Sequence, residues 1–108
     1  MRAVARSGAV FGWQNAAIPG GVTAPVALGI TSGVRLSGNL PPEVTRLQVF
    51  EASSTNLSLA VKLATEPAAL PWDRSGISAG QPRWHWLRSV SAEGNVSVLI
   101  GPVTATAI

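Results

Sequence analysis

The sequence predicts an all-β protein, a sandwich of about seven short strands. From Val34 onward, short runs rich in Val, Leu, Ile, Thr and Trp are separated by turn signals such as Ser-Gly, Pro-Pro and Glu-Gly-Asn. These signals recur about every 8–12 residues, which is typical of a β-sandwich or small barrel. The 11 glycines and 8 prolines leave few places for a long helix. A chain of 108 residues is enough for one domain with a single core.

Seven strands are expected along the chain, each with boundaries uncertain by about two to four residues. They cover residues 27–31, 34–38, 46–51, 59–64, 69–72, 83–91 and 95–106. In the third strand, Leu47 and Val49 fall on one face and are predicted to be core. Arg46, Gln48 and Phe50 fall on the opposite face and are predicted to point outward.

The fourth strand is also compatible with a helix, but the apolar residues at positions 57, 59, 61 and 63 alternate without a break, which favours a strand. At the end of the fifth strand, Trp72 is expected to close the core beneath a turn. Asp73 is expected to cap that turn through its own side chain.

The strand at 83–91 carries apolar residues on both faces, which is typical of a central strand. One face holds Trp84, Trp86 and Val90, and the other holds His85, Leu87 and Ser89. Apolar bulk alone favours the tryptophan face as the core face.

Several segments resemble a fibronectin type III-like domain, of the kind found in phage tail tip attachment (host specificity) and tail fibre proteins. The similarity runs from about Ala24 to the C-terminus, and the last 30 residues or so carry most of it. The segments that carry it are 47–53, 72–76, 76–80, 86–90, 94–97 and 101–106. The resemblance implies a seven-stranded immunoglobulin-like sandwich with a structural or adhesive role.

The chain departs from that family pattern at two places. The second strand ends in Leu36-Ser37-Gly38-Asn39, where the family usually has a Trp. Arg83 aligns with the Tyr that opens the family's aromatic strand, and this alignment turns the His85 face toward the core. A buried Arg83 would need a partner for its charge. Either the strand is shifted in register, or Trp84 and Trp86 face outward and meet another surface.

Charge and composition exclude several classes of function. The net charge is +3, but the eight basic residues are scattered, so no nucleic-acid partner is expected. No apolar run approaches the roughly 18 residues of a membrane span, so no membrane insertion is expected. The chain has no cysteine, which excludes disulfides and suits folding in a reducing cytosol. The apolar run after the basic N-terminus is too short for a cleaved export signal.

The sequence predicts no catalytic residue, no metal site and no cofactor. His85 is the only histidine and has no nearby co-ligand or orienting partner in the sequence. The five acidic residues lie in five different segments, so no pair of carboxylates is set up for glycosidase chemistry. The glycines at 20–21 lack the lysine and helix of a phosphate-binding loop.

The candidate binding residues are aromatic or lie in one turn. Trp84 and Trp86 either fill the core or form an exposed strip that binds a partner subunit or the face of a sugar. Near the N-terminus, Trp13 and Phe11 are candidate interface anchors. Glu93 and Asn95 lie in a turn between strands, where recognition sites often occur in this fold.

The chain divides into an N-terminal extension, residues 1–22, and a sandwich, residues 23–108. Residues 1–13 are weakly similar to residues 87–99 (Arg2 with Arg88, and Gly8 with Gly94). The extension is therefore a candidate remnant of an upstream repeat, which docks as an assembly arm on a neighbouring subunit or on the domain's own edge.

The resemblance implies a non-catalytic structural or adhesion module of a phage virion, in the tail tip or tail fibre. Such a protein would be made in the host cytoplasm, form a homo-oligomer, contact other virion proteins, and bind a host receptor or glycan. One alternative is a stand-alone carbohydrate- or surface-binding module that uses Trp84 and Trp86. Another is a small capsid decoration protein.

Overall fold

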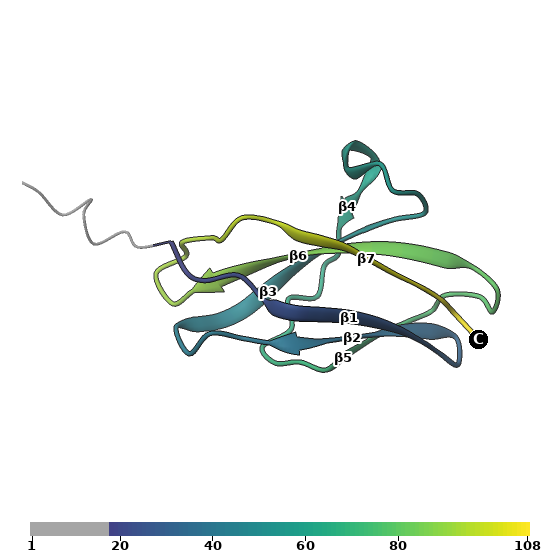
Figure 1. Ribbon diagram of the computed structural model, residues 1–108, viewed down its shortest axis with the longest axis horizontal. Coiled ribbons are helices and arrows are strands. Elements are labelled where there is room, and N and C mark those ends of the chain that lie inside the picture. Colours follow the sequence, from purple (N-terminus) through teal and green to yellow (C-terminus); the bar gives the residue numbers. More distant parts are fainter. Residues whose placement is uncertain (1–17) are drawn as a thin grey trace, which may run out of the picture.

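The computed structural model describes residues 18–108, which form two antiparallel sheets packed face to face (Figure 1). The first sheet has the order β1-β2-β5, with β1 at Thr23–Ile30, β2 at Gly33–Asn39 and β5 at Trp72–Ser75. The second has the order β4-β3-β6-β7, with β4 at Val61–Lys62, β3 at Val44–Ala52, β6 at Pro82–Ser91 and β7 at Ile100–Thr106. The predicted all-β sandwich of seven strands is confirmed.

Two of the predicted strands, the fourth and the last, are shorter than expected, and the fifth is shifted along the chain. Residues 57–59 form a 3₁₀ turn, not a strand, because Asn56 caps that turn by accepting a hydrogen bond from the Ser58 N–H at 3.1 Å. Only β4 remains of the fourth strand. The fifth begins at Trp72, after two prolines that cannot donate to a ladder. The last begins at Ile100, with an isolated Val90–Val96 bridge before it. No helix among the described residues is long and apolar enough to cross a membrane.

The core lies between the sheets and confirms the predicted faces of β3. Leu47 and Val49 are fully buried in it. Trp72 is half-buried and packs against this core, as expected. The core cluster consists of Val22, Val34, Leu36, Leu47, Val49, Ile77, Leu87 and Ala107.

The structure decides which face of residues 83–91 meets the core, which the sequence leaves open: it is the His85 face that the family alignment implies, not the tryptophan face that apolar bulk favours. Leu87 lies in the core cluster opposite Val49, and His85 lies on the same face of β6. Residues on both faces of β6 are buried, Trp86 and Val90 as well as His85 and Leu87, so apolar bulk could not identify the core face. Arg83 is half-buried, and its Nη1 donates to the Pro82 carbonyl at 2.8 Å.

One lateral side of the sandwich is closed where β1 approaches β7. A Cβ atom on Gly29 would overlap with the Thr106 carbonyl oxygen, so the two backbones are in direct contact. Ile108 extends this closure: its N–H donates to the Ile30 carbonyl at 3.0 Å, and its carbonyl accepts from the Ser32 N–H at 3.0 Å. The C-terminus therefore lies beside the β1–β2 turn (Figure 1). The edge strands of the other side are β4 and β5.

Candidate functional site

Trp84 and Trp86 lie on the outer face of the four-stranded sheet, in a ladder of cross-strand pairs with β3. Trp86 is opposite Phe50, and the Arg88 guanidinium lies over the Phe50 ring, 5.3 Å from its centroid. Arg88 also donates from Nε and Nη2 to Gln48 Oε1, at 2.9 and 2.6 Å. Trp86 is only 4% exposed and Trp84 is half-buried, so the part of this strip that faces solvent is small.

The other predicted binding residues lie elsewhere. Glu93 is exposed and Asn95 half-buried in the turn after β6, at the far end of that strand from Trp84. Three hydrogen bonds hold the turn: the Ser91 N–H donates to the Asn95 carbonyl at 2.9 Å, the Gly94 N–H donates to the Ser91 carbonyl at 3.0 Å, and the Asn95 N–H donates to Ser91 Oγ at 3.2 Å. Trp13 and Phe11 lie outside the described residues. Among residues 18–108, the structure therefore does not bring Trp84 and Trp86 together with Glu93 and Asn95.

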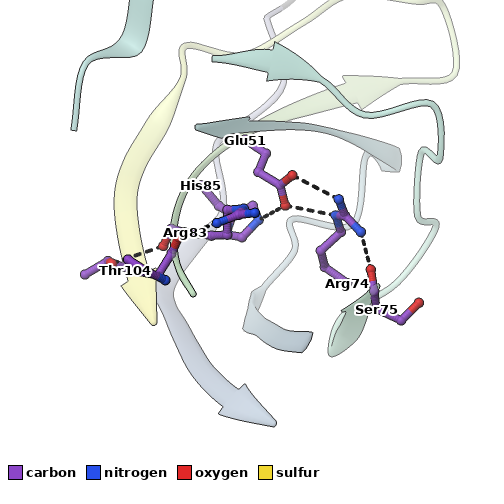
Figure 2. Close-up of polar contacts among 7 residues, drawn as sticks. Glu51, Arg74, Ser75, Arg83, His85 and Thr104 are labelled. Atoms are coloured by element: carbon purple, nitrogen blue, oxygen red, sulfur yellow. Dashed lines mark hydrogen bonds and ion pairs between the residues drawn. The ribbon is translucent and has the colours of Figure 1, made fainter. Parts of the chain in front are cut away.

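A partly buried polar cluster that the sequence does not predict joins Glu51, Arg74 and His85 (Figure 2). Arg74 Nε donates to Glu51 Oε2 at 2.9 Å, and Arg74 Nη2 donates to Glu51 Oε1 at 3.0 Å. His85 Nε2 lies 3.0 Å from the same Glu51 Oε2. Arg74 comes from β5 and Glu51 from β3, so the bidentate pair links the two sheets.

The electrostatics of this cluster keep Glu51 ionised and His85 neutral. Burial alone would raise the pKa of Glu51, but hydrogen bonds from Arg74 and His85 outweigh burial and hold the pKa below its ordinary value. Burial lowers the pKa of His85, and the Glu51 carboxylate only partly opposes that effect. The neutral imidazole therefore donates from Nε2 to Glu51. Its Nδ1 has no hydrogen-bond partner among residues 18–108.

One sequence signal could have identified Glu51, whereas the positions of His85 and Arg74 in the cluster come from the structure. Glu51 continues the inward alternation of Leu47 and Val49, and His85 stands opposite Glu51 in the ladder. His85 is completely buried. The arrangement is suited to linking the sheets.

The remaining acids are mostly engaged as well. Asp73 does not cap its own turn as expected: it accepts from Arg35 Nε at 2.7 Å and Nη2 at 3.1 Å, which lowers its pKa. Hydrogen bonds from Lys62 and then Arg46 lower the pKa of Glu66.

The last engaged acid is Glu43, whose Oε2 accepts from the Gly20 N–H at 3.0 Å; this hydrogen bond lowers its pKa. No group of three potential metal ligands occurs in the described part of the chain.

Two surface features remain beside β4. The first is an apolar edge segment, which we define as Leu57, Leu59 and Val61; Leu59 is 64% exposed and Val61 is 67% exposed. The second is a pocket of about 350 Å³ between β5 and the chain that follows β4. Its lining includes Leu63, Thr65, Trp72, Asp73, Arg74 and Ser75.

Comparison with known proteins bears on the fold. No protein-family model matches the chain, and no curated protein sequence matches it. A solved Fn3-like protein from Clostridium thermocellum is 15% identical, with a TM-score of 0.71 over 85% of this chain and 96% of that one. A β-1,2-glucanase from Parabacteroides distasonis is 13% identical, with a TM-score of 0.62 over 84% of this chain.

A third similar structure is the pectate lyase PelI from Erwinia chrysanthemi, in complex with tetragalacturonic acid. It is 19% identical, with a TM-score of 0.57 over 75% of this chain. The chain spans only 14% of the glucanase and 27% of the pectate lyase. At these identities the similarity concerns the fold alone, and the chain has a fibronectin type III-like β-sandwich fold.

Proposed function

We propose that the chain is a non-catalytic module that acts through protein–protein contacts, as a structural or adhesion domain in the tail tip or tail fibre of a phage virion. Its partners are further copies of itself and other virion proteins, with a host-surface receptor or glycan as a further target. The placement in a virion tail rests on the resemblance of segments such as 86–90 and 101–106 to phage tail domains.

The apolar edge segment is the observation that carries the protein-contact role. Leu57, Leu59 and Val61 are exposed and lie close together in sequence, on the 3₁₀ turn and β4. Clustered exposed apolar side chains on a small domain commonly mark a surface that a partner covers. A chain with 46% hydrophobic and only 12% charged residues is also suited to assembly.

The state of the acidic residues supports a non-catalytic role. A general acid needs a raised carboxyl pKa, but the pKa values of Glu43, Glu51, Glu66 and Asp73 are all lowered by hydrogen bonds from donors on the protein.

The test compares two matched double variants by light scattering coupled to size exclusion. The full chain should be oligomeric, and L59K/V61K should be a folded monomer with an unchanged thermal midpoint. V26K/L28K is the control, because Val26 and Leu28 on β1 are also exposed, have the same spacing and lie away from β4. A monomeric wild-type chain, or an oligomer broken only by V26K/L28K, would contradict the proposal.

A second candidate is a stand-alone carbohydrate- or surface-binding module. The fold similarity to parts of a β-1,2-glucanase and of a pectate lyase favours it. The half-buried Trp84 offers only a small aromatic surface for that role.

A further inference from the structure

The outer face of the four-stranded sheet carries more positive than negative charge. In the described chain, its cations are Arg46, Lys62 and Arg88, and the carboxylate beside them is Glu66. Arg46 Nε and Lys62 Nζ share that one carboxylate, at 2.8 and 2.9 Å. Arg88 makes no ion pair within residues 18–108. The face therefore has an excess of positive charge that this part of the chain does not neutralise.

Neutral neighbours hold Arg88 in a fixed position. Its Nε and Nη2 both donate to Gln48 Oε1, so one edge of the guanidinium is already used. The Phe50 ring lies beneath the guanidinium, 5.3 Å from centroid to Cζ. Arg88 Nη1, on the other edge, makes no hydrogen bond among residues 18–108 and is not one of the buried atoms without a partner, so it is open to solvent.

The open edge of this guanidinium fits a carboxylate. The N–H groups of Nη1 and Nη2 form a planar fork that matches two carboxylate oxygens. Because Gln48 and Phe50 already fix the side chain, less entropy is lost when a ligand binds. The acids of the described chain accept hydrogen bonds elsewhere, apart from the exposed Glu93.

The three cations are spaced one per row along β3. Lys62 is opposite Phe50, and Arg88 is opposite Gln48. Arg46 stands one row further along β3. Side chains on one face of a strand repeat every two residues, about 6.4–6.8 Å apart. An extended peptide with an acid at every second position therefore has a carboxylate for each row.

The shape of this face favours a protein partner over a sugar. Binding sites for small molecules are concave, and none of these cations lines the pocket beside β5. An arginine beside aromatic residues on an open sheet face is typical of the centre of a protein–protein interface.

We propose that the outer face of the four-stranded sheet binds an extended acidic segment of a protein partner, with one carboxylate on the open edge of the Arg88 guanidinium. Acids at alternate positions of the segment lie near Lys62 and Arg46. This surface goes beyond the assembly of copies through Leu59 and Val61, and the two are tested independently.

The test is a titration of the ¹⁵N-labelled full chain followed by NMR. The acidic probe is an acetylated, amidated heptapeptide in which Glu and Thr alternate, with Glu at both ends. One control peptide has Gln in place of each Glu, and an oligoglucuronate represents a sugar that carries carboxylates. With the acidic peptide, saturable shifts are expected for the Arg88 Nε–H and the Gln48 side-chain amide. The Kd should be on the order of millimolar.

Variants of Arg88 test the location. R88M keeps the aliphatic stem over Phe50 but loses the fork, so the Kd should rise by at least about tenfold, as for a lost charge-assisted hydrogen bond. R88K keeps the charge without the fork and should lie between R88M and the wild type. R35M is the matched control, since Arg35 lies on the other sheet; it should bind like the wild type. The dispersion of the amide spectrum reports that each variant is folded.

The variant E93Q tests whether a second copy already fills the site. If Glu93 of another copy bound Arg88, E93Q would release that arginine and tighten peptide binding. We expect E93Q to bind the peptide like the wild type.

Any of four results would overturn the proposal: no saturable shifts with the acidic peptide, an unchanged Kd for R88M, tighter binding of the oligoglucuronate than of the peptide, and tighter peptide binding by E93Q. Light scattering separates the two functions. R88M should keep the oligomeric state of the wild type, and a monomeric wild-type chain that binds the peptide through Arg88 would contradict only the assembly through Leu59 and Val61.

Discussion

At the scale of single residues, His85 has the most unusual environment in the described structure. Its side chain is fully buried, Nε2 contacts Glu51 and Nδ1 has no partner among residues 18–108. Arg74 and Arg83 add positive charge nearby, which lowers the pKa of His85 further. A second proton would therefore give a buried cation beside a carboxylate that Arg74 already neutralises.

We predict that the protein loses stability as the pH falls below about 6.5, the ordinary pKa of histidine. The unfolded chain takes up a proton at His85 there, while the folded chain, with its lowered pKa, does not. The free energy of unfolding should fall by at most about 1.4 kcal/mol per pH unit, until the pH reaches the folded pKa. Urea denaturation between pH 8 and pH 5 measures this slope.

The variant H85Q is the control for this slope. Glutamine keeps an N–H donor for Glu51 but does not titrate, so the decrease between pH 6.5 and 5 should disappear. Stability should still fall below about pH 4.5 in both proteins, because the pKa values of Glu51 and Glu66 are lowered by folding. A wild-type curve that is flat from pH 7 to 5 would contradict the assignment.

At the scale of elements, the two lateral sides of the sandwich behave differently. β1 and β7 touch through their backbones at Gly29, and Ile108 adds two backbone hydrogen bonds there. On the other side, β4 is only two residues long and carries Lys62. Both features make it unfavourable for a strand of another chain to pair with this edge. A partner at that edge is therefore expected to contact the side chains of Leu59 and Val61.

We predict that G29A destabilises the protein by about 1–3 kcal/mol, because its methyl group would force β1 away from the Thr106 carbonyl. Denaturation in urea measures the change. The neighbouring L28A removes an exposed side chain and should change stability by no more than about 0.5 kcal/mol. Equal changes in the free energy of unfolding for G29A and L28A would show that the close contact at Gly29 does not limit which side chain this position can hold.

At the scale of the whole molecule, the Glu51–Arg74 ion pair links the two sheets, since Arg74 lies on β5 and Glu51 on β3. The Arg35–Asp73 pair makes a similar bidentate contact within the first sheet. The two pairs differ mainly in exposure: the side chains are 27% and 12% exposed for Arg74 and Glu51, against 45% and 46% for Arg35 and Asp73. This difference makes them a matched comparison.

We predict that R74M costs about 2–4 kcal/mol, because it leaves the Glu51 carboxylate largely buried without its main counter-charge. R35M should cost much less, since water solvates Asp73 once its partner is removed. Thermal and urea denaturation of both variants measure the difference. If R35M lowered the free energy of unfolding as much as R74M does, burial of the remaining carboxylate would not explain the cost of breaking these pairs. The double variant E51Q/R74M should recover part of the loss.

The strand pattern could be predicted from the sequence because it depends on local periodicity. Alternation alone predicts that Leu47 and Val49 are core, and the turn residues predict the positions of most of the strands. The predicted strand at 59–64 contains β4 but is too long, because the Asn56 cap turns residues 57–59 into a 3₁₀ turn although Leu57 and Leu59 alternate as in a strand. The candidate binding residues Glu93 and Trp84 were predicted separately, and the structure keeps them at opposite ends of β6.

The sequence by itself determined the all-β class, the approximate positions of the strands and the absence of cysteine chemistry. These follow from composition and from contacts between near neighbours in the chain. Only the tertiary structure decided which face of β6 meets the core, that Arg74 reaches Glu51 and His85, and that Trp72 and Thr65 line one pocket. Each of these depends on how the two sheets stack. The alternation of side chains along a strand shows which residues share a face, but it does not give the distance between residues that are far apart in the sequence.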